Sequence, residues 1–127
     1  MKILTALTSC LLIPLSSLFA SVSGTYHVHG GNPSEGTSYT GVLVIEKDDE
    51  IFHATWQLSD GSSTGIGVKK DDHLAINFLG VDANNEPILG VQLYKIYEHG
   101  LEGPWAISGQ TTKGVEIAKK EKSSSCR

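Results

Sequence analysis

Two histidines offer the most direct route to metal chemistry in this chain. His27 and His29 lie two positions apart, so on an extended strand their side chains point to the same face. That spacing can bring two imidazoles to one metal ion. A third ligand would have to come from another strand, and the sequence pattern names none. We therefore predict no metal site and no cofactor, and keep a two-histidine site as the alternative.

The acidic residues occupy two kinds of position. Asp48-Asp49-Glu50 and Asp71-Asp72 lie between alternating apolar segments, which is typical of solvent-exposed hairpin turns, and no twelve-residue calcium loop surrounds them. Glu116 lies within a predicted strand and can either enter the interior or face solvent. A buried carboxylate would need partners such as tyrosine hydroxyls or backbone amides. We favour the surface position.

Hydrolytic chemistry is not indicated by the sequence. Serine, histidine and aspartate are plentiful, but no nucleophile-elbow motif and no catalytic pair of carboxylates positions them. We predict no catalytic residues and no enzymatic activity.

Residues 1–20 have the pattern of an export signal: a positive start, a broken apolar stretch over residues 3–19, and a small residue, Ala20, at the end. We expect a signal peptide cleaved after Ala20, with Ser23 as the second choice, and a secreted or periplasmic protein. The stretch is too interrupted for a stable membrane span. Too few residues precede Cys10 for a lipoprotein anchor, and we expect none.

Charge excludes one class of partner. The chain has a formal net charge of −4, and no cluster of Lys and Arg in the predicted domain could neutralise phosphates, so nucleic-acid binding is not expected. The basic residues near the end fall in a predicted flexible polar tail, residues 120–127. Cys126 would be the only cysteine left after signal removal, so it is either inert or the partner in an intermolecular disulfide.

Alternation of apolar and polar residues dominates the rest of the chain. A glycine recurs inside these segments, which indicates strong bending, a bulge or the close approach of another backbone. Turns rich in Asp, Asn and Gly join the segments, and the connection over 30–36 is a candidate mobile lid. We predict one all-β domain over residues 21–119, an eight-stranded antiparallel up-and-down barrel closed on itself to remove exposed edges. The predicted strands are 24–29, 37–46, 50–58, 62–69, 73–80, 87–97, 101–108 and 113–119.

The two-residue period also predicts which side chains point inward. Trp56 and the apolar residues at every second position of its strand define one inner face. We expect Tyr26 and Trp105 beside Trp56 across the lumen. The other residues expected inside are Val28, Tyr39, Leu43, Ile45, Phe52, Ala54, Leu58, Ile66, Val68, Leu74, Ile76, Phe78, Gln92, Tyr94, Ile96, Leu101 and Ile107. Gly65 and Gly67 would then lie on the opposite face of their strand, at a bend or beneath an aromatic ring.

An eight-stranded barrel is either filled by its own side chains or hollow enough for one small ligand. The predicted lining is aromatic, with one amide as a polar anchor, and both outcomes stay open. The candidate ligand-binding residues of the lumen are Tyr26, Tyr39, Trp56, Phe78, Gln92, Tyr94 and Trp105.

A family resemblance supports the predicted architecture. Gly24-Thr25-Tyr26 resembles the Gly-x-Trp signature of the calycins, the lipocalin and avidin-like barrels, with Tyr in place of Trp. Asn32-Pro33 and Tyr39-Thr40-Gly41 are similar to segments of small exported bacterial barrels, some loosely labelled fibronectin-binding. The arginine that packs over the signature aromatic in lipocalins has no counterpart, because Arg127 is the only arginine. The resemblance therefore implies a lipocalin/avidin-like barrel rather than a particular ligand.

Two functions fit such a barrel. We favour a non-catalytic binding module that recognises a protein or surface partner through its loops or an outer sheet face. The alternative is a lipocalin-like carrier that holds a small apolar ligand in its aromatic lumen.

Overall fold

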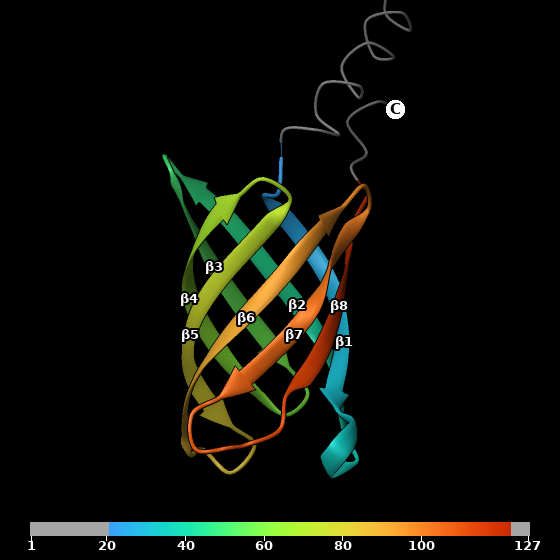
Figure 1. Ribbon diagram of the computed structural model, residues 1–127, viewed down its shortest axis with the longest axis vertical. Helices are drawn as coiled ribbons and strands as arrows, with labels where there is room; N and C mark the ends of the chain where they lie inside the picture. The colour runs from blue at the N-terminus through green and yellow to red at the C-terminus, as the bar shows by residue number, and fades with distance from the viewer. Residues whose placement is uncertain (1–20, 123–127) are drawn as a thin grey trace, which may run out of the picture.

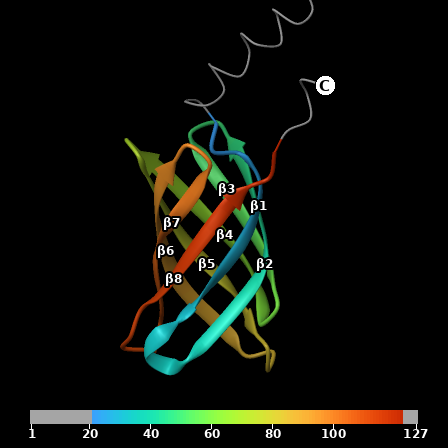
Figure 2. The ribbon, with the colours of Figure 1, turned by 90° about the vertical axis from the view of Figure 1, so that its right-hand side faces the viewer.

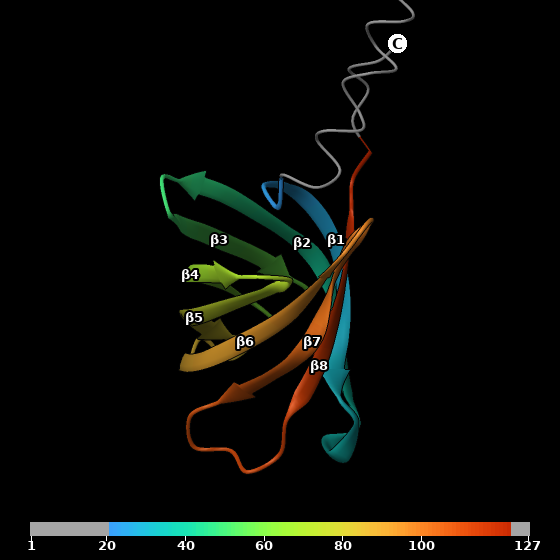
Figure 3. The same ribbon diagram turned by 45° about the horizontal axis from the view of Figure 1, so that its top comes forward.

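The protein is a closed barrel of eight strands in a computed structural model that describes residues 21–122. Each strand pairs antiparallel with the next strand along the chain. The last strand also pairs antiparallel with the first, which closes the barrel (Figures 1 and 2). The strands therefore follow one another around the barrel in chain order (Figure 3). They are β1 Gly24–Asn32, β2 Thr37–Asp48, β3 Ile51–Leu58, β4 Gly61–Lys70, β5 His73–Asp82, β6 Pro87–Tyr97, β7 Gly100–Ile107 and β8 Gly114–Lys120.

The predicted barrel and its strand boundaries are confirmed to within a few residues. The predicted signal peptide and Cys126 lie outside the described residues. The two acidic turns join β2 to β3 and β4 to β5, where Asp49 and Asp71 adopt left-handed backbone angles that Asp tolerates better than most residues. No helix among residues 21–122 is long and apolar enough to cross a membrane.

The predicted lid over 30–36 is strand in its first three residues. Gly30 to Asn32 continue β1 and pair with the start of β2. Only a short 3₁₀ helix, η1 (Pro33–Glu35), remains, and the Asn32 side chain caps it by accepting from the Ser34 N–H at 3.1 Å. Side-chain capping and strand pairing hold the segment at both sides.

The predicted inward faces are confirmed for β1, β2, β3, β5, β6 and β7 but not for β4, and in β8 the favoured outward position of Glu116 is also wrong. Ile66 and Val68 are 50% and 57% exposed on the outside, while Gly65 and Gly67 point inward. A Cβ on Gly65 would come within 2.7 Å of Ile76 Cγ2, so larger side chains from β5 already fill this space. Small residues therefore take the inner positions of β4, and its apolar residues are left outside. Of the two environments expected for these glycines, a bend or an aromatic ring above them, the second is not found, because the nearest side chain is Ile76.

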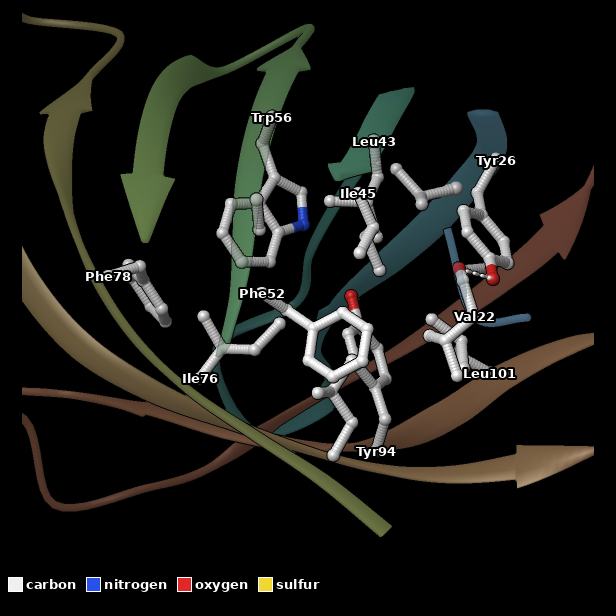
Figure 4. Packing of buried hydrophobic residues seen from close by; sticks show 14 residues of the cluster. Val22, Tyr26, Leu43, Ile45, Phe52, Trp56, Ile76, Phe78, Tyr94 and Leu101 are labelled. Carbon is white, nitrogen blue, oxygen red and sulfur yellow. Dashed lines mark hydrogen bonds between the residues drawn. The ribbon is translucent and has the colours of Figure 1, made fainter. Parts of the chain in front are cut away.

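One end of the barrel is sealed by the segment before β1. Val22 is buried there, and its carbonyl accepts a hydrogen bond from the Tyr26 hydroxyl (Figure 4). Lys120 donates to the Ser21 carbonyl at 3.0 Å, and burial lowers the pKa of its ammonium. The first and last described residues lie at this end, opposite η1 (Figure 1).

Candidate ligand-binding cavity

A cavity of about 220 Å³ opens at the end of the barrel that carries η1. Around it lie η1 and the loops that join β3 to β4, β5 to β6 and β7 to β8. The lining residues are Asn32, Glu35, Thr37, Tyr39, Trp56, Leu58, Asp60, Gly61, Phe78, Val81, Asp82, Ile88, Gln92, Trp105, Ile107, Gln110 and Glu116. The cavity is thus a cup with an aromatic and aliphatic wall and a polar rim.

The cup is lined by one buried acidic residue, Glu116, which is only 2% exposed. It accepts hydrogen bonds from the Tyr39 hydroxyl at 2.7 Å, from Trp56 Nε1 at 3.0 Å and from the Tyr94 hydroxyl. Trp56 and Tyr94 extend into the barrel from opposite parts of its wall (Figure 4). The favoured surface position for Glu116 was therefore wrong. Tyrosine hydroxyls, together with an indole N–H, supply the partners that a buried carboxylate needs.

The Glu116 carboxylate changes the acidity of its tyrosine partners. Burial raises the pKa of Tyr39 and of Tyr94 well above the ordinary tyrosine value, and the charge and hydrogen bond of Glu116 raise both further. Both hydroxyls are therefore held in the protonated form, in which they donate. No Lys, Arg or His among the described residues lies within ion-pair distance of Glu116.

Gln92 forms part of the cavity wall and has one polar atom left over. Its amide N–H groups donate to the carbonyls of Gly103 at 3.0 Å and Pro104 at 3.1 Å, where Pro104 breaks the ladder between β6 and β7. This contact orients the amide, and its oxygen has no donor among the described residues. No described side-chain nitrogen or oxygen is both fully buried and unpartnered, so the Gln92 oxygen faces the cavity.

Glycines on neighbouring strands position three of the four aromatic wall residues. A Cβ on Gly114 would lie 2.1 Å from the Trp105 ring, and one on Gly90 would lie 2.5 Å from the Phe78 ring. A Cβ on Gly30 would lie 2.6 Å from the Tyr39 hydroxyl. Each ring rests on bare backbone, a close approach that only glycine permits. Tyr39 also packs against Trp105, and Trp56 meets Phe78 edge-on, with centroid separations of 6.3 and 5.6 Å.

The rim is acidic. Glu35, Asp60 and Asp82 line the mouth, and no Lys, Arg or His does. Burial, reinforced by the charge of Asp82, raises the pKa of Asp60. Asp82 also accepts from the backbone N–H groups of Asn84 and Glu86, which fixes the loop between β5 and β6.

The structure brings most of the predicted lumen residues to one place. Five line the cavity: Tyr39, Trp56, Phe78, Gln92 and Trp105. Tyr94 does not line the cavity; it is buried, and its hydroxyl donates to Glu116, which does line it. Tyr26 lies at the sealed end beside Val22, so its expected place next to Trp56 was wrong (Figure 4).

Several lining residues were not predicted. Glu35, Asp60 and Asp82 lie in or beside turns, and their approach to one mouth depends on barrel closure. The predicted two-residue period of β8 was the one available signal for Glu116, because it places Glu116 on the same face as Ala118.

The two histidines of β1 point outward. His27 pairs with Glu121 at 3.0 Å, and His29 is exposed. Among residues 21–122, no three His, Cys, Asp or Glu side chains gather closely enough to hold a metal ion.

No protein-family model and no curated protein matches the chain. Three similar solved structures are designed barrels. A redesigned β-barrel aligns over 84% of this chain and 94% of its own, with a TM-score of 0.63 at 17% identity. Another, mFAP1 bound to DFHBI, aligns over 79% and 94% with a TM-score of 0.61 at 18% identity. A de novo designed fluorescence-activating barrel aligns over 78% and 93% with a TM-score of 0.55 at 12% identity.

At these identities the likeness shows the fold alone. The chain shares the eight-stranded antiparallel barrel of these structures. The finer resemblance to calycins and to fibronectin-binding barrels stays a prediction.

Proposed function

We propose that the barrel binds one compact organic molecule in its open cavity. The observation that carries this proposal is the oxygen of Gln92, a polar atom of a buried side chain that faces a preformed cavity without a protein partner. This oxygen is accessible from the cavity, so a bound molecule or water can donate a hydrogen bond to it. The aromatic wall supplies the apolar contact that ligand sites usually provide.

Cavity size restricts the occupant. Natural pockets for drug-sized ligands enclose roughly 300–1,000 Å³, whereas this one holds about 220 Å³. Long-chain lipids exceed that space, so within the carrier alternative a molecule of one or two rings fits best. The barrels solved bound to DFHBI support the proposal by analogy, because they share this fold and bind a small molecule.

A pair of neighbouring substitutions tests the proposal. Ile88 lines the cavity, whereas Leu89 is exposed on the outside of the same strand. Ile88→Trp should fill the cavity and abolish binding of compact aromatic compounds, detected by saturation-transfer NMR and native mass spectrometry. Leu89→Trp should bind as the parent does. If neither parent nor control binds any member of a panel of cationic, neutral and anionic compounds, the proposal is wrong.

Protein binding, favoured from the sequence, is the second candidate. Its support is an apolar outer face across β4, β5 and β6, where large side chains are between 45% and 60% exposed. These are Ile66, Val68, Leu79, Leu89, Val91 and Leu93. Contiguous exposed apolar area often marks a contact surface. Light scattering of the parent and of Val91→Lys tests the simplest occupant, a second copy of the chain.

A further inference from the structure

Most of the polar groups that line the cavity are hydrogen-bond acceptors. Three donors of the wall are already used within the protein. The indole N–H of Trp56 and the hydroxyl of Tyr39 both donate to Glu116, and the Trp105 indole N–H donates to the Val115 carbonyl at 3.3 Å. The free oxygen of Gln92 and the carboxylates of Glu35, Asp60, Asp82 and Glu116 can only accept, whereas the amides of Asn32 and Gln110 and the hydroxyl of Thr37 can also donate. An occupant that donates hydrogen bonds therefore satisfies more of this wall than one that only accepts them.

The cavity also has an unbalanced charge. Four carboxylates line it, and none of its lining residues is basic. Glu116 is buried with hydrogen-bond donors but without a cation among the described residues. A buried carboxylate is stabilised further by a nearby positive charge. An occupant with a positive charge would supply it, whereas an anion would meet repulsion at the rim and at the floor.

The aromatic wall of the cavity also favours a positively charged occupant. The electron-rich faces of tryptophan, tyrosine and phenylalanine attract cations that come within about 6 Å of the ring centroid. Tyr39, Trp56, Phe78 and Trp105 place four such rings around a space of about 220 Å³. An engineered cavity of roughly 150 Å³ holds benzene, so this one has room for a single ring with a short charged arm.

We propose that the cavity selects a compact organic cation, a protonated amine carried on a body of one or two rings. The inference rests on the proposed function, because it names the chemical class of the molecule that the cavity binds. Gln92 and the rim carboxylates would accept from the ammonium group, and the aromatic wall would hold the body.

Three probes with one body and different head groups test the inference: 3-phenylpropylamine, 3-phenylpropan-1-ol and 3-phenylpropanoate. Titration at pH 7 by calorimetry and by NMR should show the amine binding at least about tenfold more tightly than the alcohol, and the carboxylate binding least. Raising the salt concentration should weaken the binding of the amine more than that of the alcohol.

A double substitution at the rim assigns the preference to its carboxylates. Asp60→Asn with Asp82→Asn should reduce the advantage of the amine over the alcohol several-fold and leave the alcohol nearly unchanged. Glu50→Gln, in the turn at the sealed end, is the matched control and should keep the parent's preference.

The outcomes separate the two proposals. Equal affinity for the three probes, or a preference for the carboxylate, overturns the cation inference and leaves the cavity as a binding site. If the double variant keeps the preference for the amine, the assignment of that preference to the rim carboxylates is overturned. No binding of any probe overturns the proposed function, and the inference falls with it.

Discussion

The interior of the barrel depends on one acceptor, Glu116. Three donors from β2, β3 and β6 converge on its carboxylate, so a change there leaves several groups without partners at once. Such convergent networks cost more to break than a single contact, because each orphaned buried donor keeps its desolvation penalty.

Glu116→Gln should lower the free energy of unfolding by about 1–3 kcal/mol. The amide has one acceptor oxygen instead of two, and its N–H groups would face other donors. Urea unfolding measures the loss. Glu102→Gln, on the exposed side of β7, should change stability by less than about 0.5 kcal/mol. Equal effects of the two substitutions would contradict the network.

The buried tyrosines predict loss of stability at alkaline pH. Burial raises the pKa of Tyr26 to about 12, and the pKa values of Tyr39 and Tyr94 are also raised. An unfolded tyrosine titrates near pH 10, so this stabilisation is complete below about pH 10 and is lost as the pH rises. The free energy of unfolding should fall there by up to about 1.4 kcal/mol per pH unit for each tyrosine.

Urea unfolding between pH 8 and pH 11 measures this slope. Tyr39→Phe combined with Tyr94→Phe should flatten it, because two of the raised groups are removed. An unchanged slope in the double variant would show that other groups cause the alkaline loss.

At the scale of the elements, glycines of one strand determine where the aromatic rings of a neighbouring strand lie in the cavity. Each glycine beneath an aromatic ring lies on a neighbouring strand, so the backbone of one strand sets the position of a cavity residue on the next. The recurrence of glycine noted in the sequence thus places rings as well as permitting curvature.

Gly114→Ala tests this link. The new methyl group would overlap the Trp105 ring, and we expect a loss of about 1–3 kcal/mol through overpacking. In a Trp105→Leu background the same substitution should cost less, with a coupling of about 0.5–3 kcal/mol in the double-mutant cycle. Thermal melts of the four proteins give the cycle. Additive effects would show that Trp105 does not rest on Gly114.

Strand positions could be predicted because alternation and turn residues are local signals. The faces of β4 could not, since Gly65 and Gly67 point inward only because Ile76 of β5 fills the space beside them. Likewise, nothing near Glu116 in sequence identifies its partners, because Tyr39 and Trp56 are far away along the chain. Aromatic lining is visible in the sequence, whereas charge at the mouth appears only once the barrel closes.

At the scale of the whole molecule, barrel closure gives every strand two hydrogen-bonded neighbours. Closure leaves no strand edge for pairing with other chains. The two ends differ: Val22 and Tyr26 fill one, and the cavity opens at the other. The segment before β1 is therefore part of the core.

Removing residues 1–23 should destabilise the barrel relative to removing residues 1–20. The shorter chain loses the buried Val22 side chain and the acceptor of the Tyr26 hydroxyl, at a cost of about 1.5–3 kcal/mol. Unfolding in urea compares the two. Ligand affinity should match in both, because the cavity lies at the far end. Equal stability would mean that Val22 does not contribute to the core.

The sealed end has a kinetic consequence. A molecule in the cup must arrive and depart between the same loops, so one barrier governs both directions. Narrowing that passage slows association and dissociation by the same factor and leaves the dissociation constant unchanged. Asn84→Trp, in the exposed loop between β5 and β6 and outside the cavity lining, should therefore lengthen the residence time in stopped-flow measurements without tightening binding. The loops would set how long an occupant stays, and the aromatic wall would set how tightly it binds.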